Sequence, residues 1–181
     1  MQTYNKNWLN FTVGFIVCLF IRLLPFRPPN IEPILATQMP FGKVYGGLAG
    51  FLFAFLSITA YDLVTGTLGQ WTLITASTYG VLGIISSLYF KKFKASRLNF
   101  AIFAVFGTLF FDAVTGLSIG PLFFGQSLHS AVVGQIPFTS WHLLGNVSFA
   151  LTFSPALYRL IASNKKTETR FIINHFKAKQ A

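Results

Sequence analysis

Two of the four acidic residues in the chain occur in copies of one short motif. Asp62 opens Asp-Leu-Val-Thr-Gly and Asp112 opens Asp-Ala-Val-Thr-Gly, each at the end of a long apolar run. The closing glycine commonly takes a positive φ and ends a helix, so each copy predicts a helix C-terminus. A carboxylate is unfavourable there, because the helix macrodipole is already negative. The motif is therefore either a duplicated helix stop or a place where a cation, a ligand or a proton compensates the acid.

A histidine and an asparagine form a second polar pair. The segment Phe-Thr-Ser-Trp-His-Leu-Leu-Gly-Asn places His142 and Asn146 one turn apart on one helical face. In an apolar bundle such a pair either clamps two helices by hydrogen bonds or contacts a small ligand. A metal site built from His129, His142 and an aspartate lacks a metal-binding spacing such as His-Glu-x-x-His. We therefore expect no metal ion and no cofactor.

Glu32 lies in a connector that follows Arg22. Four prolines make this connector stiff and extended rather than helical: Pro25, Pro28, Pro29 and Pro33. Arg22 can pair with Glu32 or with either aspartate, or it can extend its guanidinium toward the membrane edge as snorkelling arginines do.

Aromatic side chains flank the polar residues. Trp71, Tyr79, Trp141 and Tyr61 lie near the ends of apolar runs that are expected to face outward. Such residues are typical of the aromatic belts at membrane interfaces. We expect them to stack on a ligand only where they face the interior of a bundle.

The elements that position these residues are predicted to be membrane helices. Apolar residues make up 53% of the chain and charged residues only 10%, against about 25% charged in soluble domains. The formal net charge of +10 is concentrated in two clusters, residues 91–97 and 159–179, as is typical of cytoplasmic ends of membrane spans. Because no basic recognition motif is present, nucleic acid is not an expected partner.

Five apolar runs are long enough to cross about 30 Å of hydrocarbon as helices: residues 8–24, 44–64, 71–90, 98–114 and 138–161. A sixth run, residues 31–41, is short and carries Pro33 and Pro40, so it is either a half-helix or a short span. The first run is expected to be a retained span, since no small-residue cleavage site follows it. Cys18, the only cysteine, allows no intrachain disulfide and is expected to be plain packing.

The charge bias fits both five and six spans. With six spans both termini are cytoplasmic, and with five the N-terminus lies outside. Both arrangements place the 91–97 loop and the C-terminal tail in the cytoplasm. Both also place the turn after Val64 and the connection 115–137 on the outer side, which is nearly free of Lys and Arg yet holds Asp62 and Asp112.

The motifs occur in a distinctive order over residues 8–162. They are Leu24-Pro25, Pro-Asn-Ile-Glu-Pro33, the two aspartate motifs each preceded by an aromatic residue, Gly69-Gln-Trp-Thr72, and Phe138-Thr-Ser-Trp-His142 with Asn146. In this order the chain resembles the substrate-binding S components of the energy-coupling-factor (ECF) transporters. The resemblance implies an all-α integral membrane bundle of six transmembrane helices over residues 1–164, with the second helix short and proline-flanked. A basic cytoplasmic tail over residues 165–181 follows.

The resemblance also implies a function and partners. An S component of the plasma membrane captures a vitamin or a related small molecule from outside, then docks on a transmembrane coupling subunit driven by two ATPase subunits. The chain itself has no Walker-type glycine loop for ATP. Two other functions stay open, a membrane enzyme that uses an aspartate and a histidine, and a scaffold that binds no small molecule.

Nine side chains are the expected substrate-binding residues: Asn30, Glu32, Asp62, Trp71, Thr72, Asp112, Trp141, His142 and Asn146. The polar groups would hydrogen-bond or ion-pair with the ligand, and the tryptophans would stack on it. Thiamine-like, corrinoid-like and purine-like ligands are all compatible with these residue types. Many family members dock through Ala-x-x-x-Ala in the first span, where this chain has Gly14-x-x-x-Cys18. A small-residue ridge is an alternative docking face: Gly46, Gly50 and Ala54.

Overall fold

The computed structural model describes residues 8–26 and 30–163, and this part of the chain is helical apart from short connections. The helices are α1 (Trp8–Leu23), α2 (Ile34–Tyr45), α3 (Gly47–Thr65), α4 (Gln70–Lys92), α5 (Arg97–Gly116), α6 (Ile119–Phe124) and α7 (Leu128–Ser163). The predicted all-α class is therefore confirmed over the described residues. The predicted basic tail, residues 165–181, lies outside them, as do Pro28 and Pro29 of the connector.

Several helices have the length and composition of membrane helices. Three stretches are long and apolar enough to cross a bilayer: Gly47–Thr65, Gln70–Lys92 and Arg97–Phe124. Their outward faces carry large exposed apolar side chains, such as Leu73, Leu88 and Leu98. Soluble monomers rarely expose large continuous apolar surfaces, because water penalises them. These features indicate a membrane protein.

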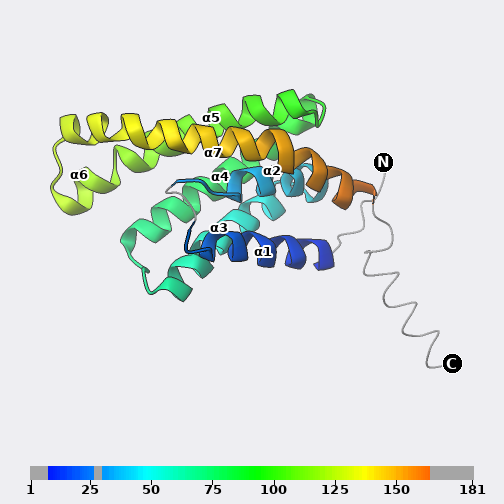
Figure 1. The fold of residues 1–181 in the computed structure, drawn as a ribbon, viewed down its shortest axis with the longest axis horizontal. Helices are drawn as coiled ribbons and strands as arrows, with labels where there is room; N and C mark the ends of the chain where they lie inside the picture. Colours follow the sequence, from blue (N-terminus) through cyan, green and yellow to red (C-terminus); the bar gives the residue numbers. More distant parts are fainter. Residues whose placement is uncertain (1–7, 27–29, 164–181) are drawn as a thin grey trace.

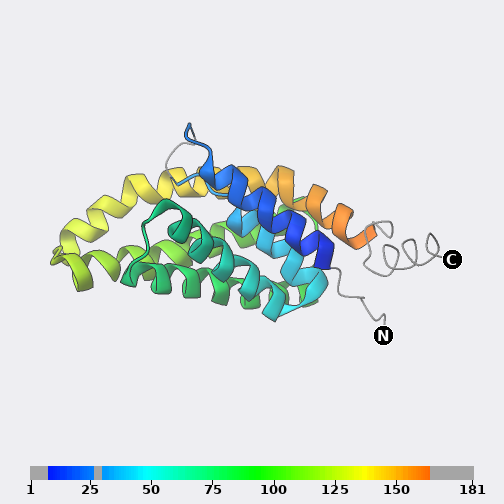
Figure 2. The same cartoon turned by 90° about the horizontal axis from the view of Figure 1, so that it is seen from below.

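The helices run between two ends of an elongated bundle. Helix α1 begins and α7 ends at one end, on the right in Figure 1, whereas α6 lies at the opposite end in both views (Figures 1 and 2). We call the first the packed end, because two groups of aromatic rings fill it. One group joins α1, α2 and α3 through Phe11, Phe41 and Phe53, and the other joins α4 and α5 through Phe90 and Phe100.

Helix α2 is enclosed by the other helices. All but two of its residues are buried, and it contacts α1, α3, α4, α5 and α7. Pro40 lies inside this helix and cannot donate to the carbonyl of Ala36, four residues earlier. The hydroxyl of Ser154 on α7 donates to that carbonyl at 2.7 Å. Hydroxyl side chains of neighbouring helices satisfy carbonyls freed by proline in this way, so the proline is accommodated in the core.

Small residues allow α3 and α4 to approach closely. A side chain placed on Gly50 would lie 2.8 Å from the carbonyl oxygen of Gly83 and 3.2 Å from Gly42 of α2. Because only glycine avoids this overlap, three backbones meet here without side chains between them. Gly46 makes the sharp turn from α2 into α3 with a φ of 95°.

The apolar runs predict most helix bounds within two or three residues, but two expectations are wrong. The short second run was placed at residues 31–41, whereas α2 begins and ends later, at Ile34 and Tyr45. The outer connection 115–137 was expected to be a loop, yet it contains α6 and the first ten residues of α7. Pro137 therefore lies inside α7 instead of ahead of it.

The two aspartate motifs also end differently. Gly66 closes α3 in the left-handed conformation with a φ of 70°, as predicted. Gly116 remains helical and α5 is capped by Leu117, so the second predicted glycine stop is wrong. At Gly116 the absence of a side chain affects packing instead of ending the helix. A Cβ there would overlap the side-chain amide of Gln135 on α7. Glycine at this position thus admits the glutamine.

Candidate functional site

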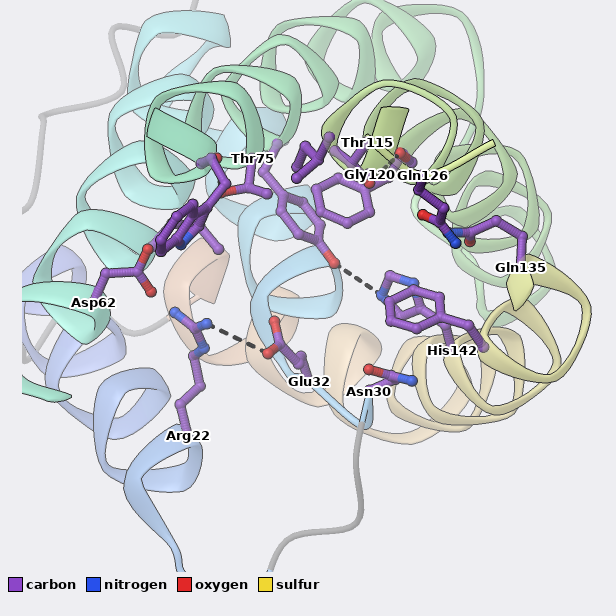
Figure 3. A pocket seen from close by; sticks show the side chains of 17 residues that line it. Arg22, Asn30, Glu32, Asp62, Thr75, Thr115, Gly120, Gln126, Gln135 and His142 are labelled. Atoms are coloured by element: carbon purple, nitrogen blue, oxygen red, sulfur yellow. Dashed lines mark hydrogen bonds and ion pairs between the residues drawn. The ribbon is translucent and has the colours of Figure 1, made fainter. Parts of the chain in front are cut away.

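A cavity of about 400 Å³ opens at the end of the bundle opposite the packed end, which we call the cavity end. Side chains from the ends of α1, α3 and α5, the starts of α4 and α7, and the segment before α2 converge on it (Figure 3). Its lining comprises Arg22, Asn30, Glu32, Ile58, Asp62, Trp71, Thr75, Tyr79, Phe111, Thr115, Gly116, Ile119, Gly120, Gln126, Gln135, Phe138 and His142. The volume lies within the range of sites for small organic ligands, about 300–1,000 Å³.

Arg22 ties the end of α1 to two other segments. Its guanidinium lies 3.3 Å from Glu32 and donates to the carbonyl oxygen of Ser57 at 2.8 Å. It also lies 4.0 Å above the ring of Tyr61, a cation–π distance. The pairing of Arg22 with Glu32, one of the predicted alternatives, is confirmed, and the guanidinium is buried instead of reaching the membrane edge.

Asp62 lies in the last turn of α3 and faces the cavity (Figure 3). The hydroxyl of Thr72 donates to its Oδ2 at 2.6 Å and accepts from the backbone N–H of Gly69 at 3.1 Å. This chain of bonds connects the end of α3 to the start of α4, and Trp71 in the first turn of α4 lines the same cavity as the carboxylate. Among the described residues no cationic side chain forms an ion pair with Asp62.

Helices α5 and α7 are joined by two polar rungs one turn apart. In the first, His142 Nδ1 lies 2.7 Å from Asp112 Oδ1, and in the second Asn146 donates to the hydroxyl of Thr108 at 2.8 Å. All four residues are buried. The predicted clamp between two helices is confirmed, and His142 in addition lines the cavity.

His142 is engaged at both ring nitrogens. Asp112 occupies the Nδ1 side, and the hydroxyl of Tyr79 lies 3.0 Å from Nε2 (Figure 3). A general base needs a ring nitrogen within reach of a substrate or nucleophile. Both ring nitrogens contact protein groups here, so the orientation of the imidazole is fixed.

Several buried polar atoms at the cavity end have no hydrogen-bond partner within the described residues. Three are acceptors, Asp112 Oδ2, Gln135 Oε1 and Asn146 Oδ1, and one is a donor, Arg22 Nε. Leaving such an atom unsatisfied costs about 1–3 kcal/mol. Two of these atoms, Gln135 Oε1 and Arg22 Nε, belong to residues that line the cavity, where a bound molecule or water can satisfy them.

The predicted substrate residues divide into three groups. Asn30, Glu32, Asp62, Trp71 and His142 line the cavity. Thr72, Asp112 and Asn146 are buried behind that lining and are bonded to it or to the helices that carry it. Trp141 lies on the outer face of α7 with 55% of its surface exposed, and it is not part of the lining.

The proposed docking residues are used inside the bundle. Gly14, Cys18, Gly50 and Ala54 are all buried. A side chain on Gly14 would overlap the ring of Phe41, and Gly50 abuts Gly83. Gly46 lies in the turn between α2 and α3. Four of these five residues are therefore not exposed on the surface of the described bundle.

Sequence reasoning missed part of the lining. Thr75, Phe111, Thr115, Gln126, Gln135 and Phe138 reach the cavity without having been predicted. The signal for Gln126 and Gln135 was hidden, because the segment that carries them was expected to be a loop. Tyr79 was interpreted as a residue of an aromatic belt, but it is buried and its hydroxyl contacts His142.

The fold and the cavity together define a class, a helical protein with membrane-compatible helices and a polar, aromatic pocket at one end of its bundle. No protein-family model, no curated protein and no solved structure matches the chain.

Proposed function

We propose that the chain is the substrate-binding S component of an ECF-type uptake transporter. In this function it captures a vitamin or a related small molecule from outside the cell and delivers it to a transmembrane coupling subunit and two ATPase subunits. The observation that carries the proposal is the cavity of about 400 Å³ in which residues from almost every helix converge. The chain has no nucleotide-binding glycine loop, so ATP hydrolysis belongs to its partners.

The distribution of charge supports an outward-facing cavity. The exposed residues Lys91, Lys92, Lys94 and Arg97 lie at the packed end. Cytoplasmic loops are enriched in such residues, so the packed end is cytoplasmic and the cavity end faces outward in this proposal. Helices α1, α2, α3, α4, α5 and α7 then form six transmembrane segments of a plasma-membrane protein with a cytoplasmic C-terminus. The short α2 is tolerated because the other helices enclose it.

A scaffold that binds nothing small would need no cavity with unsatisfied polar atoms. Burial of unpaired acceptors destabilises a protein, and solid apolar packing would remove that cost. The atoms Asp112 Oδ2 and Gln135 Oε1 therefore support capture of a ligand over a purely structural function.

Substrate uptake tests the proposal. Cells that express the chain with its partner subunits are compared for uptake of a panel of labelled vitamins. We expect the double variant Asp62→Asn with Asp112→Asn to abolish uptake of the compound that the wild type imports. Arg97→Gln, an exposed substitution at the packed end, serves as the control for expression and insertion. Unchanged uptake in the double variant, at equal expression, would remove these acids from the site.

Ligand-dependent thermal stabilisation separates capture from scaffolding. A ligand that binds the folded state raises apparent stability, by about 2.7 kcal/mol at 100 times its dissociation constant. The detergent-purified full chain should therefore melt at a higher temperature with at least one compound of the panel. Identical melting with every compound would support the scaffold.

A further inference from the structure

Among the described residues, carboxylates outnumber guanidinium and ammonium groups at the cavity end. Three carboxylates line the cavity or lie directly behind its lining, Glu32, Asp62 and Asp112, whereas Arg22 is the one arginine or lysine in the described lining. Arg22 is paired with Glu32, and Asp112 lies against His142. Of the three carboxylates, only Asp62 forms no ion pair with a cationic or imidazole side chain of the described residues.

An uncompensated negative charge is unfavourable at the position of Asp62. It is only 9% exposed and lies in the last turn of α3, where the helix dipole is negative. Its observed partner is a neutral hydroxyl, that of Thr72. Electrostatic interactions are strong at a site with little water, so a cation beside this carboxylate would be strongly favoured.

An aromatic surface lies beside that carboxylate. Trp71 precedes Thr72 in the chain, lines the cavity, and is partly supported by the ring of Phe124 at 5.9 Å. The rings of Tyr79 and Phe111, 4.1 Å apart, form another part of the wall. Aromatic faces attract organic cations, and the attraction grows when water is excluded. A flat, positively charged ring would therefore gain from both the carboxylate and the aromatic wall.

The unsatisfied atoms indicate which hydrogen bonds the ligand makes. Gln135 Oε1 is a buried acceptor on the lining, and Asp112 Oδ2 is a buried acceptor behind His142. Arg22 Nε is the one unsatisfied donor among the described residues at this end. An N–H donor of the ligand would satisfy Gln135 Oε1, the unsatisfied acceptor that lies on the described lining.

We infer, on the basis of the proposed function, that the captured molecule is a small, flat, nitrogen-containing organic cation whose positive charge is held by Asp62 and whose ring lies against Trp71. Its amino groups donate to the unsatisfied acceptor of the opposite wall, Gln135 Oε1. A cavity of about 400 Å³ accommodates a ligand of one or two rings and excludes a corrinoid. Of the three ligand types compatible with the sequence, the thiamine-like type fits this chemistry.

A charge series on one ring tests the inference. The detergent-purified full chain is melted with 1-methylnicotinamide, nicotinamide and nicotinate, which carry positive, zero and negative charge on similar rings. Thiamine serves as a larger cation with amino donors, and cyanocobalamin as an oversized compound. We expect thiamine and 1-methylnicotinamide to raise the melting temperature, with no shift from nicotinate or cyanocobalamin.

The matching variant is Asp62→Asn, whose side-chain oxygen can still accept from Thr72. Removing one partner of a buried charge pair costs about 2–5 kcal/mol, so binding of the cations should weaken at least about 30-fold. Arg97→Gln changes the charge at the packed end and should leave the cation affinity at the wild-type value. Nicotinamide, which is neutral, should bind the wild type and Asp62→Asn with equal affinity.

The outcomes separate the inference from the function on which it rests. Equal or stronger stabilisation by nicotinate, or unchanged cation binding in Asp62→Asn, overturns the cation assignment and leaves capture intact. If none of the cationic, neutral or anionic compounds raises the melting temperature, the proposed capture of a small molecule is overturned. Selective stabilisation by the cations, lost in Asp62→Asn, supports both.

Discussion

The packed end and the cavity end are built from the same helices with opposite chemistry. At the packed end, aromatic rings from six helices fill the interior, and the α3–α4 crossing has no side chain between Gly50 and Gly83. At the cavity end, the interior holds carboxylates, a guanidinium and an imidazole around about 400 Å³ of space. The described acids all lie at the second end, whereas the exposed lysines 91, 92 and 94 lie at the first.

The difference shows how a small helical protein can keep an unfavourable cavity. Buried unsatisfied polar atoms and empty volume both lower stability. Close packing at the other end of the same helices offsets that loss, because each long helix extends through both regions. We therefore expect substitutions at the packed end to change stability without changing ligand affinity, and those at the cavity end to change affinity more than stability.

Phe53→Ala gives the largest expected effect on stability. The ring of Phe53 is fully buried and contacts those of Phe11, Phe15 and Phe41. Truncation of such a ring leaves a cavity and costs about 3–5 kcal/mol. Thermal unfolding in detergent measures the loss, and the affinity of the folded fraction for 1-methylnicotinamide should not change. Phe20→Ala, on the exposed face of α1, is the control and should unfold like the wild type.

Arg22→Gln probes the cavity end, with an expected loss of about 2–3 kcal/mol. It removes the ion pair between Arg22 and Glu32, and breaking a fully buried pair costs about 3–5 kcal/mol. Glu32 is 18% exposed, so water reduces that cost. Because the cavity becomes more negative, a cationic ligand should bind more tightly to the variant even though the protein is less stable. Weaker cation binding in calorimetry, at full folding, would contradict the charge reasoning.

Most of the fold could be predicted from the lengths of the apolar runs. The predicted first run, residues 8–24, corresponds to α1 within one residue, because lipid selects uninterrupted apolar helices of a narrow length range. Proline produced the failures. Pro137 was expected to precede a helix but lies inside α7. The short run that carries Pro40 was expected to end at residue 41, but α2 continues to Tyr45. For Pro40 the reason is the hydroxyl of Ser154, which is distant in sequence, so no local pattern could reveal it.

The candidate site was predictable where a residue type was unusual for its location. Asp62 and Asp112 stood out because a carboxylate at a helix end in an apolar chain needs compensation, and both are buried at the cavity end. The tryptophans could not be separated, since Trp71 and Trp141 occur in similar contexts and only the helix rotation decides which one faces inward. Gln135 was missed because its glycine partner, Gly116, is on another helix.

A pair of glycines tests whether close backbone packing holds α3 and α4 together. In Gly83→Ala the new methyl group would overlap the backbone of Gly50, and overpacking of this kind costs about 1–3 kcal/mol. In Gly134→Ala the methyl group meets no atom within 4 Å, so the better helix propensity of alanine should leave stability equal or slightly higher. Equal melting temperatures for the two variants would show that the crossing can relax.

The smallest expected effects on stability are those of substitutions at two tryptophans that occur in similar sequence contexts. Trp71→Leu removes a ring that is 36% exposed and lines the cavity, whereas Trp141→Leu removes one that is 55% exposed outside it. Both should change stability by about 1 kcal/mol or less, since partly exposed side chains lose little packing. Loss of a cation–π contact in a partly desolvated site costs about 1–2 kcal/mol, so Trp71→Leu should weaken binding of 1-methylnicotinamide about tenfold. Trp141→Leu should leave that affinity unchanged in calorimetry, and an equal loss in both variants would mean that the ligand contacts the outer face of α7.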